Sequence, residues 1–134
     1  MSSRITYIDE DASFEVGEKR HRIIRTNLRN LIDEKDIQKF GEEIFRYIEG
    51  IGENSDSDAD YCLSLEGVDF ISSLTLGKLM IIDKKLKARV GKGLAITSTI
   101  PKIYEVFAIT QLNKLFSFYD SVENYKNEKM GPRV

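Results

Sequence analysis

Few side chains in this sequence can act as a nucleophile, a base or a metal ligand. There is one histidine, His21, and one cysteine, Cys62. A zinc site or a nucleophile–base pair needs further partners of these types. The sequence also has no G-x-S-x-G elbow and no G-x-x-x-x-G-K-[ST] phosphate loop. His21 stands among Lys19, Arg20 and Arg22, so we expect a surface position for it. We therefore predict that the chain is not an enzyme and needs no cofactor.

An acidic segment from Glu53 to Asp60 invites comparison with a calcium-binding loop. Asp56, Asp58 and Asp60 match the first three ligand positions of an EF-hand loop. The sixth position, where the sharp turn needs glycine, is Tyr61, and the twelfth, where a glutamate binds the ion, is Gly67. We expect a solvated linker here and no metal site.

Cys62 belongs to the apolar run of residues 62–65. A lone cysteine excludes an intrachain disulfide, and its neighbours Leu63 and Leu65 predict that the thiol is buried as a small hydrophobic group.

Composition points to a small folded domain with a protein partner. Apolar residues make up 41% of the 134 residues, which is enough for one core. The 22 acidic and 20 basic residues nearly cancel, which leaves a net charge of −2. The chain therefore lacks the clustered positive charge that favours binding to nucleic acid or to an anionic membrane. No stretch approaches the about 20 apolar residues of a membrane span, and the first residues lack the apolar segment of a signal peptide. We expect a cytoplasmic protein. No feature of the sequence predicts its oligomeric state.

The hydrophobic pattern alternates between strand and helix. Residues 4–28 and 61–70 read as strand, and Ile37, Phe40, Ile44 and Ile48 mark one face of a helix. Further helices are expected over residues 74–90, from Pro101, and from Ser121 to Tyr125, with strands at 94–96 and 115–119. This order predicts an α/β fold with a mixed, mostly parallel sheet of four to five strands and alternating helices. We predict a single domain over residues 1–126 and a flexible C-terminal tail over 127–134, and a core that contains Leu63, Leu65, Leu94, Ile96 and Phe116.

Two adjacent serines stand where the 61–70 strand gives way to a helix. Serine is a preferred N-cap, because its hydroxyl accepts a hydrogen bond from an unpaired backbone N–H of the first turn. Ser72 and Ser73 are therefore candidates for a capping role.

The segment Leu63–Gly77 resembles the signature of the STAS domain, the fold of bacterial anti-sigma factor antagonists. An apolar strand is followed by the step Gly67-Val68-Asp69-Phe70-Ile71, the two serines, and Leu76-Gly77 inside the helix. The resemblance covers about residues 20–126, and its other matching segments are Gly91–Ile96, Leu112–Phe116 and Tyr119–Glu123.

The resemblance implies an anti-sigma factor antagonist that acts by partner switching. Such a protein binds a kinase-type anti-sigma factor, is phosphorylated by it on a serine, and is restored by a phosphatase. Ser73 occupies the position of the phosphorylated serine. The partner-binding surface implied for this chain is the start of the helix, made of Ser72, Ser73, Leu74, Thr75 and Lys78.

The chain departs from the family pattern next to this serine. Ser72 replaces the family's aspartate, Leu74-Thr75 replaces Ser-Gly, and Gln111 replaces a glycine. The lost carboxylate bears on phosphorylation and not on the fold. It leaves open an alternative function, a non-phosphorylated structural STAS subunit of a signalling assembly or of a lipid-transport ATPase complex.

Overall fold

The computed structural model describes residues 4–51 and 58–131, and the elements alternate along the chain much as the sequence predicts. The elements are β1 (Thr6–Ile8), β2 (Phe14–Val16), β3 (Lys19–Thr26), β4 (Asn30–Leu31), α1 (Glu34–Ile48), β5 (Asp60–Ser64), β6 (Phe70–Ile71), α2 (Ser73–Val90), β7 (Ala95–Thr97), α3 (Pro101–Ile109), a 3₁₀ turn at Leu112–Lys114, β8 (Ser117–Tyr119) and α4 (Val122–Met130).

The main sheet has the strand order β1-β3-β5-β7-β8, and β2 also pairs with β3. The strands β3, β5, β7 and β8 are parallel, whereas β1 and β2 run antiparallel to β3. The expected mixed, mostly parallel sheet is thus confirmed. The short strands β4 and β6 form a separate parallel pair.

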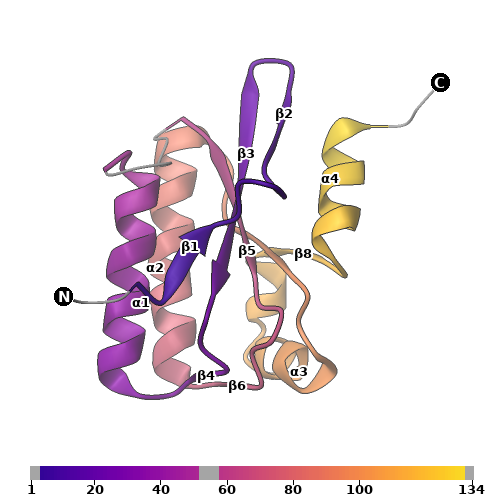
Figure 1. Cartoon of the computed structure of the whole chain (residues 1–134). Coiled ribbons are helices and arrows are strands. Elements are labelled where there is room, and N and C mark those ends of the chain that lie inside the picture. Colours follow the sequence, from indigo (N-terminus) through magenta and orange to yellow (C-terminus); the bar gives the residue numbers. More distant parts are fainter. Residues whose placement is uncertain (1–3, 52–57, 132–134) are drawn as a thin grey trace.

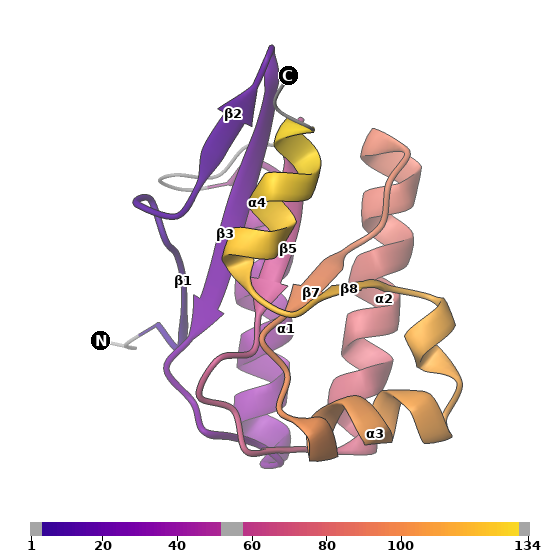
Figure 2. The same cartoon turned by 90° about the vertical axis from the view of Figure 1, so that its right-hand side faces the viewer.

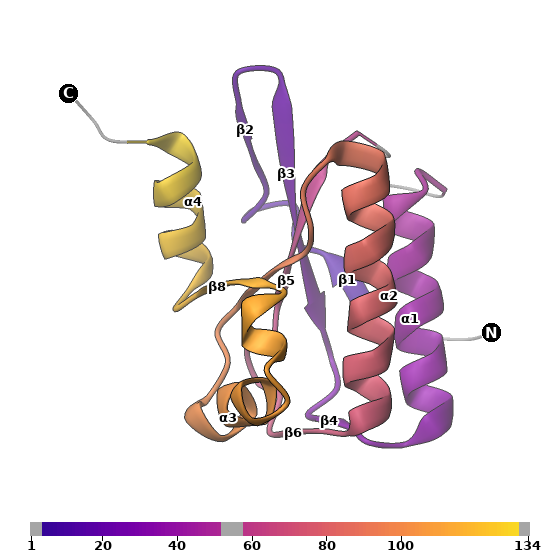
Figure 3. The same cartoon turned by 180° about the vertical axis from the view of Figure 1, so that it is seen from behind.

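Helices cover both faces of the sheet. Figure 1 shows α1 and α2 side by side on one face and α4 on the other, while α3 lies at the lower end, near β4 and β6. Figure 3 shows the same arrangement from behind, with α2 beside α1. The larger core lies between the sheet and α1, α2 and α3, and it contains the five residues predicted for it: Leu63, Leu65, Leu94, Ile96 and Phe116.

Local signals explain where the helices begin and end. Asp33 caps α1, since its carboxylate accepts hydrogen bonds from the backbone N–H groups of Lys35 and Asp36. Pro101 occupies the first turn of α3, where its missing N–H costs nothing. At the end of α2, Gly91 has a φ of 79°, a left-handed conformation that glycine adopts at little cost.

Two boundaries differ from the sequence prediction. The strand expected over 61–70 ends at Ser64, and Phe70 lies in β6 with half of its surface exposed, because a turn at residues 66–67 breaks the apolar run. At the C-terminus, α4 continues to Met130, so the tail predicted from residue 127 is helical over its first four residues. A short polar helix that buries Tyr125 alone has no apolar periodicity to reveal it. Residues 132–134 of that tail lie outside the described residues.

Within the described ranges, every helix is too short or too polar to cross a bilayer.

Candidate functional site

The two serines occupy different positions at the start of α2. Ser72 is the N-cap: its backbone is extended and its hydroxyl accepts a hydrogen bond of 3.4 Å from the backbone N–H of Thr75. Ser73 is the first residue of the helix and is exposed. Its hydroxyl has no hydrogen-bond partner among the described residues. Capping therefore belongs to Ser72, and the Ser73 hydroxyl is available for another use.

Thr75 cannot contact a partner, which corrects the expectation that it forms part of the binding surface. It is wholly buried, and its hydroxyl donates a hydrogen bond of 2.7 Å to the carbonyl oxygen of Leu31 in β4. The same carbonyl accepts from the backbone N–H of Ser72 at 3.0 Å. These two bonds fix the start of α2 against β4.

The other residues expected at the surface are accessible. Leu74 is 43% exposed. Lys78, one turn further along α2, is half-buried, and a Cβ added to Gly41 of α1 would lie 3.3 Å from its Cδ. The glycine thus leaves room for the lysine stem to lie against α1.

Further apolar side chains are exposed on the segments that meet at Ser73. Pairing of β4 with β6 places Leu31 opposite Ile71, so Ile32 and Phe70 come to the same end of the molecule as the start of α2 (Figure 1). Ile32 is 54% exposed and Phe70 is 50% exposed. We call Ile32, Phe70, Ser72, Ser73, Leu74 and Lys78 the Ser73 surface. Exposed apolar residues that lie singly are ordinary, whereas a contiguous apolar patch marks a binding surface.

The sequence did not reveal Ile32 or Phe70 as surface residues. Phe70 was expected within a buried strand, and Ile32 lies in a short loop without periodicity. The ammonium of Lys102 in α3 lies 3.6 Å from the centroid of the Phe70 ring, a cation–π contact that connects α3 to this surface.

The loop before β6 is held by an ion pair. The Arg29 guanidinium donates to the Asp69 carboxylate from Nη2 at 2.7 Å and from Nε at 3.1 Å. The backbone N–H of Asp69 also donates to the Arg29 carbonyl at 2.6 Å. These contacts position Phe70 beside the start of α2 without covering it.

His21 is buried, which corrects the surface position expected for it. Its ring stacks on Phe14 with centroids 4.8 Å apart, and its Nδ1 lies 2.9 Å from the hydroxyl of Tyr125. Burial lowers the pKa of His21, although the nearby Asp60 carboxylate acts in the opposite direction. The basic neighbours on β3 suggested a charged surface, but alternate residues of a strand point to opposite faces, and His21 points toward α4.

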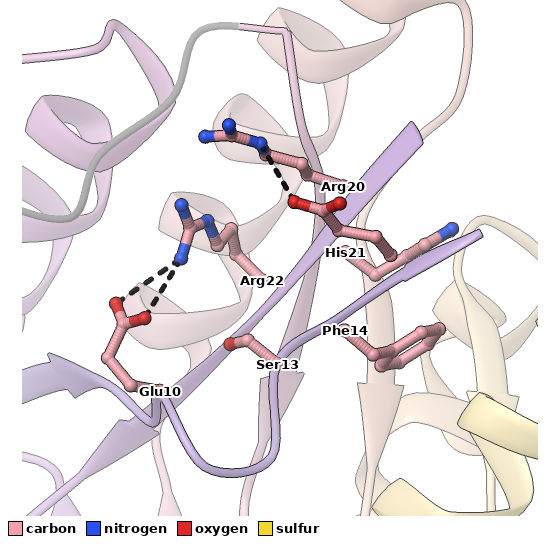
Figure 4. Close-up of a pocket in the computed structure, with 7 residues that line it drawn as sticks. Glu10, Ser13, Phe14, Arg20, His21 and Arg22 are labelled. Carbon is pink, nitrogen blue, oxygen red and sulfur yellow. Dashed lines mark hydrogen bonds and ion pairs between the residues drawn. The ribbon is translucent and has the colours of Figure 1, made fainter. Parts of the chain in front are cut away.

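A small cavity of about 170 Å³ lies along β2 and β3, close to His21. Its charged side chains are paired: Figure 4 shows Arg22 facing Glu10, and Arg20 forms an ion pair with Glu15. The N–O distances are 3.2 Å in both pairs. Because each arginine already has a carboxylate beside it, the cavity offers little net charge to a ligand.

Cys62 is fully buried in β5, as the sequence predicts. Burial raises the pKa of its thiol to about 12. A thiol that stays protonated is a poor nucleophile and a poor metal ligand.

The acidic segment gives no sign of a metal centre in the part of the chain that the structure describes. No group of three or more His, Cys, Asp or Glu side chains there has a metal-binding arrangement. Asp56 lies outside the described residues. Asp60, expected in a solvated linker, is instead buried as the first residue of β5.

Comparison with known proteins places the chain in a family. Residues 16–125 match the STAS domain, and the chain belongs to the STAS domain family. No curated protein sequence matches it.

Solved structures with the same fold include three that are described as anti-sigma factor antagonists or putative ones. A putative anti-sigma factor antagonist from Thermotoga maritima has 20% identity and a TM-score of 0.62, with 79% of this chain and 86% of that chain covered. An anti-sigma-factor antagonist (STAS) domain protein from Planctomyces limnophilus has 17% identity and a TM-score of 0.66, covering 90% and 92%. The anti-sigma factor antagonist SpoIIAA in its unphosphorylated form has 16% identity and a TM-score of 0.56, covering 92% and 96%. These similarities confirm the expected STAS fold.

Proposed function

We propose that this protein is an anti-sigma factor antagonist that works by partner switching. It binds a kinase-type anti-sigma factor through the Ser73 surface, and phosphorylation of Ser73 ends the binding. The observation that carries the proposal is the exposed Ser73 hydroxyl, which has no hydrogen-bond partner among the described residues and is followed by the exposed Leu74. The fold shared with proteins described as anti-sigma factor antagonists supports the same function.

Electrostatics explains how one phosphate acts as a switch. A phosphoserine carries about −1.5 to −2 charges at neutral pH. The helix N-terminus accommodates an anion, because its backbone N–H groups and dipole favour negative charge. The domain should therefore stay folded when Ser73 is phosphorylated. A partner that covers Ile32, Phe70 and Leu74 would have to bury that charge, which costs several kcal/mol when no cation pairs with it.

One observation favours a second function, a structural STAS subunit that is never phosphorylated. The first turn of α2 contains no acidic residue, so nothing there replaces the carboxylate that the family has next to its phosphorylated serine. Such a subunit would use the same apolar surface permanently, within a signalling assembly or on the ATPase of a lipid-transport complex.

Purification from its native cells distinguishes the two functions. We expect a tagged protein to carry phosphate on Ser73 in part of the population, as seen by peptide mass spectrometry, and to co-purify with an anti-sigma factor kinase in its unphosphorylated form. Co-purification with a transport ATPase or a stable assembly, with no phosphate on Ser72 or Ser73, would instead establish the structural subunit. A Ser73→Ala protein is the matched control, because it retains Ser72 and hence the helix cap.

A further inference from the structure

The side of α2 that faces away from the core and from α1 is left open by the described part of the chain. The helix faces the core through Leu79, Ile82 and Leu86, which are buried. It contacts α1 through Lys85, whose ammonium lies 3.3 Å from a carboxylate oxygen of Glu49. In Figure 3 none of the described elements crosses in front of α2, and Figure 2 shows α4 in front of the sheet with α1 and α2 behind it. This side of α2 is therefore accessible to a partner.

Exposed apolar side chains lie in line along this open side. Leu74 is 43% exposed and Ile81, two turns further along, is 50% exposed. Residues seven apart lie on the same face of a helix, and Ala88, seven residues further again, is also exposed. Gly77 and Lys84 stand between these positions on the same face. We call these five residues the α2 outer face. Because Leu74 also belongs to the Ser73 surface, the α2 outer face extends that surface along the helix by about 20 Å.

Gly77, at the centre of the exposed side of α2, has no role in packing among the described residues. A Cβ added to it would meet no atom within 4 Å, whereas a Cβ added to Gly93 would collide with the carboxylate of Asp83. Gly77 is also not among the glycines with a positive φ. A glycine inside a helix destabilises it relative to alanine. What the glycine does provide is room for another backbone to approach α2 closely.

The charge of α2 favours an acidic partner. The helix contains five basic residues: Lys78, Lys84, Lys85, Lys87 and Arg89. Its one acidic residue, Asp83, is buried and pairs with Lys87 at 2.8 Å. Lys84 is exposed on the α2 outer face, between Ile81 and Ala88. A surface of this charge attracts a partner that carries carboxylates.

The shape of this face favours a protein helix over a membrane. A helix that binds an anionic membrane presents large apolar side chains to the lipid across its whole apolar face. Here the centre of the face is a glycine, flanked by Leu74 and Ile81, which removes apolar area that a membrane would bind. A second helix, in contrast, packs its side chains into the space between two such residues.

We propose that the α2 outer face binds an acidic amphipathic helix of the protein partner. The apolar side chains of that helix contact Leu74 and Ile81, its backbone comes closest to α2 at Gly77, and its carboxylates face Lys84. To contact both Leu74 and Ala88 it needs about 14 residues. The inference rests on the proposed function in that a protein binds at the Ser73 surface. It adds a second region of contact, because Ile81 and Lys84 lie two and three turns beyond Ser73.

The decisive variant is Gly77→Gln in the full chain. Calorimetry with the purified kinase-type anti-sigma factor that co-purifies with the tagged protein should show binding weakened at least about tenfold, because the new side chain blocks close approach. The free energy of unfolding should not fall, since glutamine favours a helix more than glycine does and finds open space there. Weakened binding in a protein of undiminished stability supports the proposal, and unchanged binding would overturn it.

Two further variants test the other contacts, each with a matched control. Ile81→Ala and Lys84→Glu should each weaken binding about tenfold. Ile109→Ala removes an apolar side chain that is 74% exposed on α3, and Lys126→Glu makes the same charge change on α4, so both should bind within about twofold of the unaltered protein. Effects of the controls as large as those of the variants would contradict the placement of the partner helix.

Two comparisons separate this inference from its rivals. If Ser73→Asp weakens binding while Gly77→Gln, Ile81→Ala and Lys84→Glu do not, the inference fails and the proposed function stands. If these three variants weaken binding and Ser73→Asp does not, the helix site stands and the phosphate switch fails. Vesicles of phosphatidylglycerol test the lipid alternative: the unaltered protein should not sediment with them, and sedimentation that Lys84→Glu abolishes would overturn the proposal.

Discussion

The Nδ1 atom of His21 in β3 lies 2.9 Å from the hydroxyl of Tyr125 in α4, so the one histidine of the chain joins the last helix to the sheet. Tyr125 is the only residue of α4 that is buried among those described. The attachment of α4 thus depends strongly on a contact with a titratable group.

This contact predicts that acidification destabilises the protein. Burial lowers the pKa of His21 below its ordinary value of 6.5, with Asp60 opposing and Lys129, Lys19 and Lys92 reinforcing the shift. Below about pH 6.5 the unfolded chain takes up a proton that the folded chain does not, so the free energy of unfolding falls as the pH falls. The stability that the neutral His21 contributes is fully present above that pH. Below it, the free energy of unfolding falls by at most about 1.4 kcal/mol per pH unit.

Urea unfolding between about pH 8 and pH 5.5 measures this dependence. His21→Gln keeps a polar group beside Tyr125 but does not titrate, so its free energy of unfolding should depend less on pH over the same range. An identical pH dependence in both proteins would show that the histidine does not carry the effect.

Leu65→Ala tests the position of the core. Leu65 is fully buried against the main core, and removal of a buried leucine side chain costs about 2–5 kcal/mol. Ile81→Ala is the control, because Ile81 on α2 is 50% exposed and should cost under about 1 kcal/mol. The free energies of unfolding of the two variants, measured in urea, should therefore differ clearly. A similar small loss of stability in both would mean that residue 65 is not in the core.

Cys62 should resist thiol reagents while the protein is folded. The side chain has no exposed surface and burial raises the pKa of its thiol to about 12, so little thiolate is present and access requires opening of the structure. Reaction with a chromogenic disulfide reagent should be at least about tenfold faster in denaturing urea than in buffer. Equally fast labelling of the folded protein would contradict the buried position.

The two serines should differ in their effect on stability. Ser72→Ala removes the hydroxyl that caps α2 and should lower the free energy of unfolding by about 0.5–2 kcal/mol. Ser73→Ala removes a hydroxyl without a hydrogen-bond partner among the described residues and should change it by less than about 0.5 kcal/mol. Thermal melts of both proteins provide the measurement, and the reverse order would show that Ser73 is the cap.

The parts of the fold that the sequence predicted are those with strong periodicity or a clear terminal signal. Ile37, Phe40 and Ile44 define the buried face of α1, and Leu94 and Ile96 mark a buried strand. The C-terminal end of α4 was missed, because one buried tyrosine in nine residues leaves no pattern.

The candidate site was only partly predictable for a related reason. Ser73 and Leu74 could be named from the family resemblance and are exposed as expected. Thr75 was misplaced because burial within the first helical turn depends on β4, whose Leu31 carbonyl lies far away in the sequence. The contributions of Ile32 and Phe70 likewise depend on the pairing of two-residue strands, which no local pattern reveals.

The most direct test of the account compares binding of the proposed partner, a kinase-type anti-sigma factor, by unaltered protein, Ser73→Asp and Ser73→Ala. The aspartate puts a charge into the apolar contact, so calorimetry should show binding weakened by about a hundredfold or more, while the melting temperature stays close to that of the unaltered protein. Ser73→Ala should bind within about threefold of it and take up no phosphate from the kinase. Equal binding by all three proteins, with no phosphate on Ser73, would contradict the switch.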